Sequence, residues 1–220
     1  MQKTVTALTC ACPSSVVLKF DCSNAFNTMP RQLVLDAVRA RVRSLAHAAS
    51  FWLSQPTTHL FWEGGGRGKP ITATTGVDQG SPLSPAFFAI GLADFLERIQ
   101  RQLVTLSPAC RVFSYLDDVV VVAPAGVSGQ AMQAVIAELQ AVGLTVNAGK
   151  TAAWTADPQV PLPPEVQGLR VDKCRLLGAC APWLENDGDL ARSECSVWPK
   201  GRKWCAPPAT SSPEWSRLGV

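Results

Sequence analysis

Two adjacent aspartates, Asp117 and Asp118, interrupt one of the most apolar runs of the chain, FSYLDDVVVVAP at 113–124. Two like charges about 4 Å apart repel by about 4 kcal/mol at the effective dielectric of a protein surface, so the fold must offset this repulsion. In one continuous strand the two side chains would point to opposite faces, and one would enter the core. A strand-turn-strand hairpin instead brings both carboxylates to a loop tip. This stretch alone leaves an ordinary turn and a metal site equally open.

The composition describes a globular chain. Of its 220 residues, 47% are hydrophobic and 17% are charged. No apolar run reaches the roughly 18 residues that span a bilayer, and the N-terminus lacks the hydrophobic core of a signal peptide. We therefore expect an intracellular protein, in the nucleus or the cytoplasm, with no membrane partner. The net charge of +3 neither demands nor excludes nucleic acid. The eight cysteines form no CxxC, and the two histidines miss zinc spacing, so we expect reduced thiols.

The hydrophobic pattern alternates between strands and helices. A short apolar strand over 16–20 ends at Asp21, and helical spacing predicts helices over 30–53, 85–103 and 128–142. Ser128 is the expected N-cap of the last helix, and Gly143 ends it. The remaining predicted strands are 61–63 and 71–75 around GGGRGK, then 144–146, 152–155 and 174–177. We expect 1–15 to be a short leader and 181–220 an irregular, disordered tail.

Asp21 is a second acidic position that could bind a metal ion together with Asp117 and Asp118. If the strand that ends at Asp21 lies beside the hairpin, Asp21 approaches Asp117. Magnesium prefers oxygen ligands, usually one or two carboxylates plus substrate phosphates. Two such ions about 4 Å apart activate an attacking oxygen and stabilise a leaving one. Asp21, Asp117 and Asp118 are therefore candidate metal ligands, although Asp21 taken alone is more simply an aspartate at a strand end.

Three blocks in order carry a resemblance: DCSNAFNT at 21–28, QGSPLSP at 79–85 and YLDD at 115–118. Together they resemble the palm of a reverse transcriptase, an RNA-directed DNA polymerase, over about 16–178. The second block is most similar to the non-LTR retrotransposon and group II intron type. The resemblance implies a polymerase palm, an α+β fold with an antiparallel sheet and helices packed on one side. Such a palm adds a deoxynucleotide (dNTP) to a primer 3′-hydroxyl on an RNA or DNA template. It also implies two Mg²⁺ ions as cofactors, with Mn²⁺ as a substitute.

The resemblance assigns catalytic roles to four residues. Asp21, Asp117 and Asp118 match the metal-binding aspartates of the family. Lys150 matches the lysine proposed to protonate the departing pyrophosphate. Without the resemblance, Lys150 would be an ordinary surface lysine.

Four further residues match binding positions. Phe26 matches the bulky side chain that excludes a ribose 2′-hydroxyl, and alone it would be a core phenylalanine. Gln79 and Gly80 match the loop that contacts the incoming nucleotide and the template, where glycine allows close backbone approach. Tyr115 matches the residue at the primer end. Leu177 and Gly178 resemble the start of the primer grip.

The chain also departs from the family. Fingers strands with a basic pair that holds the triphosphate are not matched ahead of Asp21, and a helical thumb is not matched either. We therefore expect a palm fragment that does not extend a primer on its own. The first alternative is an inactive, truncated retroelement remnant that at most binds nucleic acid. An RNA-dependent RNA polymerase would not favour Phe26 as a sugar gate. A non-enzymatic module with an acidic metal-binding turn would explain YLDD but not QGSPLSP.

Overall fold

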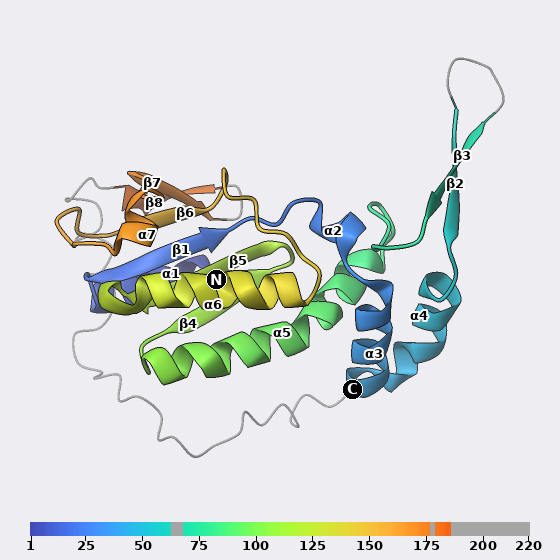
Figure 1. The fold of residues 1–220 in the computed structure, drawn as a ribbon, viewed down its shortest axis with the longest axis horizontal. Helices are drawn as coiled ribbons and strands as arrows, with labels where there is room; N and C mark the ends of the chain where they lie inside the picture. Colours follow the sequence, from blue (N-terminus) through green and yellow to red (C-terminus); the bar gives the residue numbers. More distant parts are fainter. Residues whose placement is uncertain (63–67, 177–178, 186–220) are drawn as a thin grey trace.

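A four-stranded antiparallel sheet, with strand order β4-β5-β1-β6, lies at the centre of the computed structural model (Figure 1). The structure describes residues 1–62, 68–176 and 179–185. The strands of the sheet are β1 (Ser15–Phe20), β4 (Arg111–Tyr115), β5 (Asp118–Pro124) and β6 (Ala152–Thr155). In the described part of the chain, no helix is long and apolar enough to cross a membrane.

The two central strands, β1 and β5, are rich in valine because both of their faces are covered. Val16 and Leu18 are buried on one face and Val17 on the other. The register pairs Phe20 with Val119, so the end of β1 lies beside the beginning of β5. Antiparallel pairing therefore brings Asp21 and the YLDD turn to the same end of the sheet.

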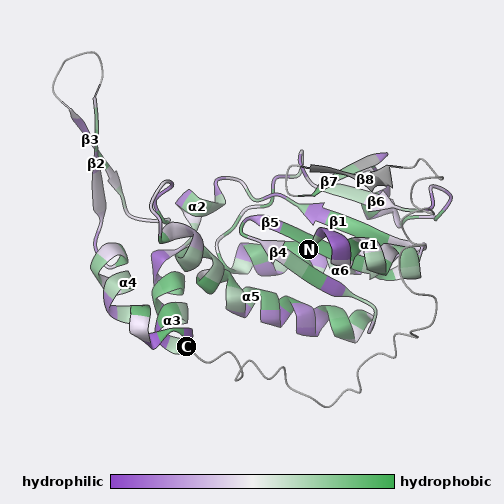
Figure 2. Cartoon of the chain, turned by 180° about the vertical axis from the view of Figure 1, so that it is seen from behind, coloured by the Kyte–Doolittle hydropathy of each residue, from purple (hydrophilic) through white to green (hydrophobic). Residues whose placement is uncertain are grey.

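The first face of the sheet is covered by the long helix α5 (Ser84–Leu106) and by α6 (Ser128–Ala141). Helix α5 starts with Pro85 in its first turn, a position where a missing N–H costs nothing. Its buried stripe includes Phe88, Leu92, Phe95 and Ile99, and burying each such side chain contributes about 1.5–3 kcal/mol. Figure 2 shows the hydrophobic and hydrophilic residues alternating along this helix, as an amphipathic helix requires.

Of the two predictions for the ends of α6, one is correct and one is wrong. Gly143 follows the helix with a φ of +82°, as the expected stop requires. Ser128 is not the N-cap: the cap residue is Val127, and the Ser128 hydroxyl donates to the carbonyl of Ala125 at 2.8 Å. The short 3-10 turn η2 (Ala125–Val127) precedes the helix. Its first residue supplies the carbonyl that accepts the hydrogen bond, so the Ser128 hydroxyl points toward this turn and does not cap the helix.

The second face of the sheet is covered by α1 (Gln2–Ala11) and β7 (Lys173–Leu176), and β7 pairs with β8 (Ala179–Glu185). Val5 of α1 packs in a cluster with Val17, Trp154 and Cys174. The segment expected as a leader is thus mostly a helix that closes the core. The prediction of an α+β fold with an antiparallel sheet and packed helices is confirmed, and α1 adds a helix on the opposite side.

The boundary of the expected tail is displaced. Strand β8 continues to Glu185, past the expected start of an irregular tail at 181. The rest of that segment, 186–220, lies outside the described residues, as do Leu177 and Gly178.

The single helix predicted over 30–53 is wrong. It is divided into α3 (Arg31–Arg41), the 3-10 turn η1 (Arg43–Leu45) and α4 (Ala46–Leu53), with a non-helical backbone at Val42 (φ −139°, ψ 68°). A continuous helix of this length would extend about 36 Å and carry its last turns away from the core. The break lets α4 pack beside α3, which buries Ala49 and Leu53 (Figure 1).

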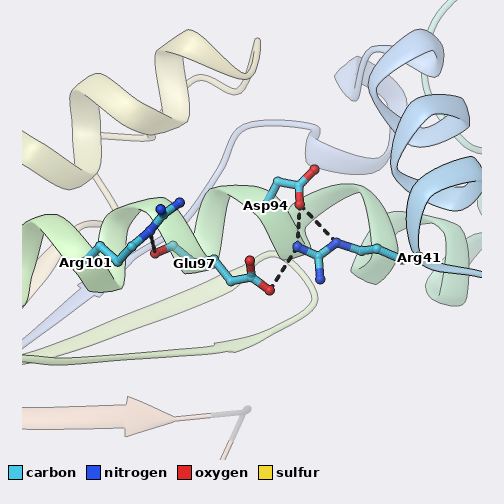
Figure 3. Close-up of polar contacts among 4 residues, drawn as sticks. All are labelled: Arg41, Asp94, Glu97 and Arg101. Atoms are coloured by element: carbon cyan, nitrogen blue, oxygen red, sulfur yellow. Dashed lines mark hydrogen bonds and ion pairs between the residues drawn. The ribbon is translucent and has the colours of Figure 1, made fainter. Parts of the chain in front are cut away.

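An ion-pair network fastens the end of α3 to α5. Arg41 Nε donates to Asp94 Oδ1 at 3.0 Å, and Arg41 Nη2 lies 2.9 Å from Glu97 Oε1. Arg101 Nε in turn donates to the main-chain oxygen of Glu97 (Figure 3). The hydrogen bond from Arg41 lowers the pKa of Glu97. Because these side chains are largely exposed, the network orients α3 more than it stabilises the fold.

The predicted hairpin around GGGRGK is confirmed, although both of its strands begin and end earlier in the sequence than predicted. Strand β2 (Thr57–Phe61) pairs with β3 (Lys69–Ala73), and the hairpin projects from the body beyond α4 (Figure 1). Glu63, the expected end of its first strand, lies outside the described residues.

The remaining segments are short. Single helical turns form at α2 (Ala25–Thr28) and α7 (Pro164–Gln167). The strand predicted over 144–146 is wrong, because only an isolated bridge joins Val146 to Cys22.

Candidate active site

Asp21 and Asp117 lie at the same end of the sheet, as the predicted topology requires. Both act on the buried thiol of Cys22, which follows β1. Burial first, and then the negative charges of Asp117 and Asp21, raise the pKa of Cys22 from 9.0 to about 11. The structure therefore brings together two carboxylates that are far apart in the sequence.

The YLDD segment is the tight hairpin expected from its flanks. Tyr115 pairs with Asp118, which leaves Leu116 and Asp117 as a two-residue turn between β4 and β5. Leu116 has a φ of +55°, a conformation that suits the twist of a two-residue hairpin but costs a non-glycine residue about 1–2 kcal/mol. The Ser114 hydroxyl donates to the Leu116 carbonyl at 2.9 Å and helps hold this turn. Tyr115 is 59% exposed beside the acids.

Lys150, the predicted proton donor, forms an ion pair with Asp21. Its Nζ is 3.4 Å from Asp21 Oδ2. The turn 147–151 creates this placement: Asn147 N donates to the Asp21 carbonyl at 2.8 Å, and Lys150 N donates to the Asn147 carbonyl. The turn interrupts the pairing of the chain with β1 and carries the lysine side chain to the carboxylate.

Lys19 is a site residue that the sequence reasoning missed. Its Nζ lies 3.4 Å from Asp118 Oδ1, and both side chains are about three-quarters covered. A signal was present, because Lys19 is the only charged residue in the apolar strand SVVLKF, and a partly buried charge needs a partner. Lys19 and Lys150 together offset the repulsion among the three acids.

The three predicted metal ligands do not form a ready three-ligand site. Among the described residues, no group of three or more Asp, Glu, His or Cys side chains is arranged to hold a metal ion. Asp118 is paired with Lys19, whereas Asp21 and Asp117 both lie close enough to Cys22 for their charges to raise the pKa of its thiol. Two carboxylates are nevertheless the donor set that Mg²⁺ uses when substrate phosphates supply further ligands.

Phe26 lies in α2 with one face of its ring covered. The ring stacks on Phe88 of α5, with centroids 4.5 Å apart and an angle of 8° between the planes. The residue as a whole is half-buried. Its main-chain carbonyl accepts a hydrogen bond from Val77 N at 2.8 Å, which ties it to the segment that leads to Gln79.

Gln79 lines a cavity of about 360 Å³ at the base of the hairpin, together with Asn27, His59 and Asp78. His59 Nε2 lies 3.3 Å from Asp78 Oδ1. Gly80 has a φ of +94°, and a Cβ atom there would meet nothing within 4 Å. The backbone at Gly80 is thus open to a ligand. The structure brings Phe26 and the Gln79 loop together through Val77, and the YLDD turn, Asp21 and Lys150 form the neighbouring group.

Two sets of known proteins are similar to this chain. It is 32% identical over 133 residues to a retrotransposable element SLACS 132 kDa protein of Trypanosoma brucei gambiense, covering 60% of this chain and 11% of that protein. Among solved structures, a telomerase from Candida tropicalis in complex with a TWJ fragment of telomeric RNA superposes with a TM-score of 0.58 at 13% identity, over 81% of this chain and 31% of that one. A Candida albicans telomerase gives a TM-score of 0.57 at 15% identity, over 74% and 31%.

The telomerases show a common fold at low identity, and the chain spans about a tenth of the length of the retrotransposon protein. The model of the family reverse transcriptase (RNA-dependent DNA polymerase) matches residues 5–180, from α1 into β8. The chain therefore belongs to the reverse transcriptase family and is, by family, an RNA-directed DNA polymerase.

Proposed function

We propose that this chain forms the polymerising site of a retroelement reverse transcriptase, which joins a dNTP to a primer 3′-hydroxyl by a two-metal mechanism. The observation that carries the proposal is the meeting of Asp21 and Asp117 at one end of the sheet, beside Lys150. The hydroxyl oxygen forms a bond to the α-phosphorus, and the bond to pyrophosphate breaks.

Asp21 and Asp117 would hold Mg²⁺, or Mn²⁺ in its place. The bound ions would supply charge neutralisation at the α-phosphate and at the attacking and leaving oxygens. Asp118 is held by Lys19 in this structure, so its part as the third proposed ligand requires the release of that ion pair. Lys150, whose Nζ lies 3.4 Å from Asp21, would donate a proton to the leaving pyrophosphate.

The residues around the acids fit the binding roles. Phe88 covers one face of the Phe26 ring and restricts its orientation, and the other face would meet a ribose 2′-hydroxyl. The open backbone at Gly80 and the side chain of Gln79 would contact the nucleotide and the template. Exposed Tyr115 would contact the primer end.

A template strand and a primer are the proposed macromolecular partners. The telomerase in the structural comparison is bound to a fragment of telomeric RNA, which supports a nucleic-acid partner for this fold. A net charge of +3 gives only weak, salt-sensitive attraction to a phosphate backbone, so we expect binding to depend strongly on ionic strength.

The test measures metal binding by thermal unfolding and polymerase activity by primer extension. Thermal unfolding is followed with increasing Mg²⁺ or Mn²⁺, because an ion that binds only the folded chain raises its melting temperature. Primer extension uses poly(A), oligo(dT) and labelled dTTP. We expect Asp117→Asn to remove most of the metal-dependent stabilisation and any extension, whereas Asp36→Asn, an exposed aspartate on α3, changes neither. A metal response that is equal in wild type and Asp117→Asn contradicts the proposal.

A further inference from the structure

Arg31, the first residue of α3, is a buried cation whose guanidinium binds two separate segments of the chain through three acceptors. The residue is 6% exposed. Its Nε donates to the Gly76 carbonyl at 2.9 Å, Nη1 to the Gln55 carbonyl at 2.7 Å and Nη2 to the Thr57 hydroxyl at 2.7 Å. The planar fork of arginine reaches the three acceptors from three separate nitrogens, whereas the three donors of a lysine ammonium all lie on one nitrogen.

The three acceptors belong to elements that meet at the proposed nucleotide site. Gln55 follows α4, and Thr57 begins β2 of the projecting hairpin. Gly76 lies three residues before Gln79, in the segment that joins β3 to the loop of Gln79 and Gly80. Arg31 therefore connects the base of the hairpin with the loop in front of α5.

The segment at Gly76 is also fixed to the Phe26 region. Thr75 Oγ1 donates to the Asn27 carbonyl, Gly76 N donates to the Met29 carbonyl, and Val77 N donates to the Phe26 carbonyl. Gly76 has a φ of +77°, and a Cβ atom there would lie 2.4 Å from Asn27 O. The loop is thus locked on one side by α2 and on the other by Arg31.

We propose that Arg31 is a positioning residue: through the Gly76 carbonyl it fixes Gln79 and Gly80 relative to Phe26 and the base of the hairpin. Its effect on nucleotide binding rests on the proposed function, whereas its effect on the loop does not. Removal of Arg31 leaves the carbonyls of Gly76 and Gln55 without their buried donor, so the loop and the hairpin base separate while the central sheet stays intact.

The test compares Arg31→Ala and Arg31→Lys with Arg39→Ala, an exposed arginine of the same helix that pairs with Asp36. Hydrogen exchange is measured at the Gly76 and Val77 amides and at amides of β1 and β5. We expect exchange at Gly76 and Val77 to accelerate roughly ten- to a hundred-fold in Arg31→Ala, since a buried charged hydrogen bond is lost. Arg31→Lys shows most of this change, and the β1 and β5 amides and the Arg39→Ala protein remain as in wild type.

Two further measurements separate positioning from general stability. Added ethylguanidinium, but not ethylammonium, restores protection in Arg31→Ala. The dissociation constant for dTTP with Mg²⁺ and poly(A)·oligo(dT), measured by calorimetry, rises about tenfold in Arg31→Ala, while the affinity for poly(A)·oligo(dT) alone changes less than about twofold.

Each outcome decides a separate point. Unchanged exchange at Gly76 and Val77, or equal acceleration in the loop and in the central strands, overturns the positioning role. If Arg31→Ala does not fold, the same exchange criteria apply to Arg31→Lys. Failure of the wild-type chain to bind dTTP overturns the proposed function and the part of the inference that concerns nucleotides, whereas the exchange result still decides whether Arg31 positions the loop.

Discussion

Replacement of Phe26 by alanine tests whether one ring can serve both the core and the sugar site. Truncation of a fully buried phenylalanine to alanine lowers the free energy of unfolding by about 3–5 kcal/mol, and aromatic stacking accounts for about 0.5–1.5 kcal/mol of this loss. Phe26 is half-buried, and its covered face keeps the stack on Phe88. We therefore expect Phe26→Ala to lower the free energy of unfolding by about 2–3 kcal/mol, which corresponds to about 5–10 °C in melting temperature for a domain of this size.

The functional half of this prediction concerns the exposed face of the ring. Without the ring, a ribose 2′-hydroxyl no longer meets a steric barrier, and the preference for dTTP over UTP on poly(A)·oligo(dT) should fall about tenfold or more. Competition between the two nucleotides, in binding or in incorporation, measures this ratio. Phe95→Leu is the matched control, because Phe95 is fully buried on the same helix as Phe88 and has no place at the site.

The two halves can fail separately. A loss of stability below about 1 kcal/mol would show that the stack on Phe88 contributes little. A folded Phe26→Ala protein that keeps the wild-type sugar preference would refute the gate. A similar fall in the preference in Phe95→Leu would show that loosening of the core, and not the missing ring, is responsible.

Three other features give predictions. Gly76→Ala should cost at least about 2 kcal/mol in urea unfolding, because its φ of +77° disfavours a side chain and its Cβ would meet Asn27 O; Gly126→Ala, with open space around it, should not. Burial raises the pKa of Cys174 from 9.0 to about 11, so the unfolded chain loses this proton before the folded one does. The stability that the thiol contributes is complete below pH 9 and is lost as the pH rises towards 11, and Cys174→Ala should reduce that slope in thermal melts. Arg41→Met should cost about 0.2–1 kcal/mol at low salt and less at high salt, and no salt dependence of this difference would contradict an electrostatic role.

The sequence predicted best where the local pattern and the tertiary fold agree. Strand β1, the YLDD hairpin and α5 are specified by valine runs, by a two-residue turn and by an amphipathic repeat. The helix over 30–53 fails because helical spacing continues past Val42, while the burial of Leu53 requires the chain to turn back. Helix α1 was missed because it buries little more than Val5, too weak a stripe to detect.

The candidate site likewise contains contacts that the sequence predicts and contacts that depend on the tertiary fold. Asp21 and Asp117 could be placed together from the order of the blocks, because a strand end and a hairpin turn meet when the strands pair antiparallel. The pairing of Asp118 with Lys19 depends on the register of β1 with β5, which no local pattern shows. Arg31 gave no signal at all, since an arginine after a proline at a helix start is ordinary, and only the folded chain surrounds it with three acceptors.

The sheet order β4-β5-β1-β6 also governs how the chain can fold as it is synthesised. Within residues 1–62, 68–176 and 179–185, strand β1 pairs only with β5 and β6, and β5 lies roughly a hundred positions later. At about 5–20 residues per second, β1 waits about 5–20 s on the ribosome for its first partner, with an unpaired valine-rich backbone available to other chains. Such non-local pairing makes folding slow, and any nascent chain that stops before the YLDD turn has a complete α3 and Asp21 but neither Asp117 nor Asp118. A chaperone that holds the segment from β1 to β4 until β5 is made should therefore raise the yield of folded protein more than one that acts after release.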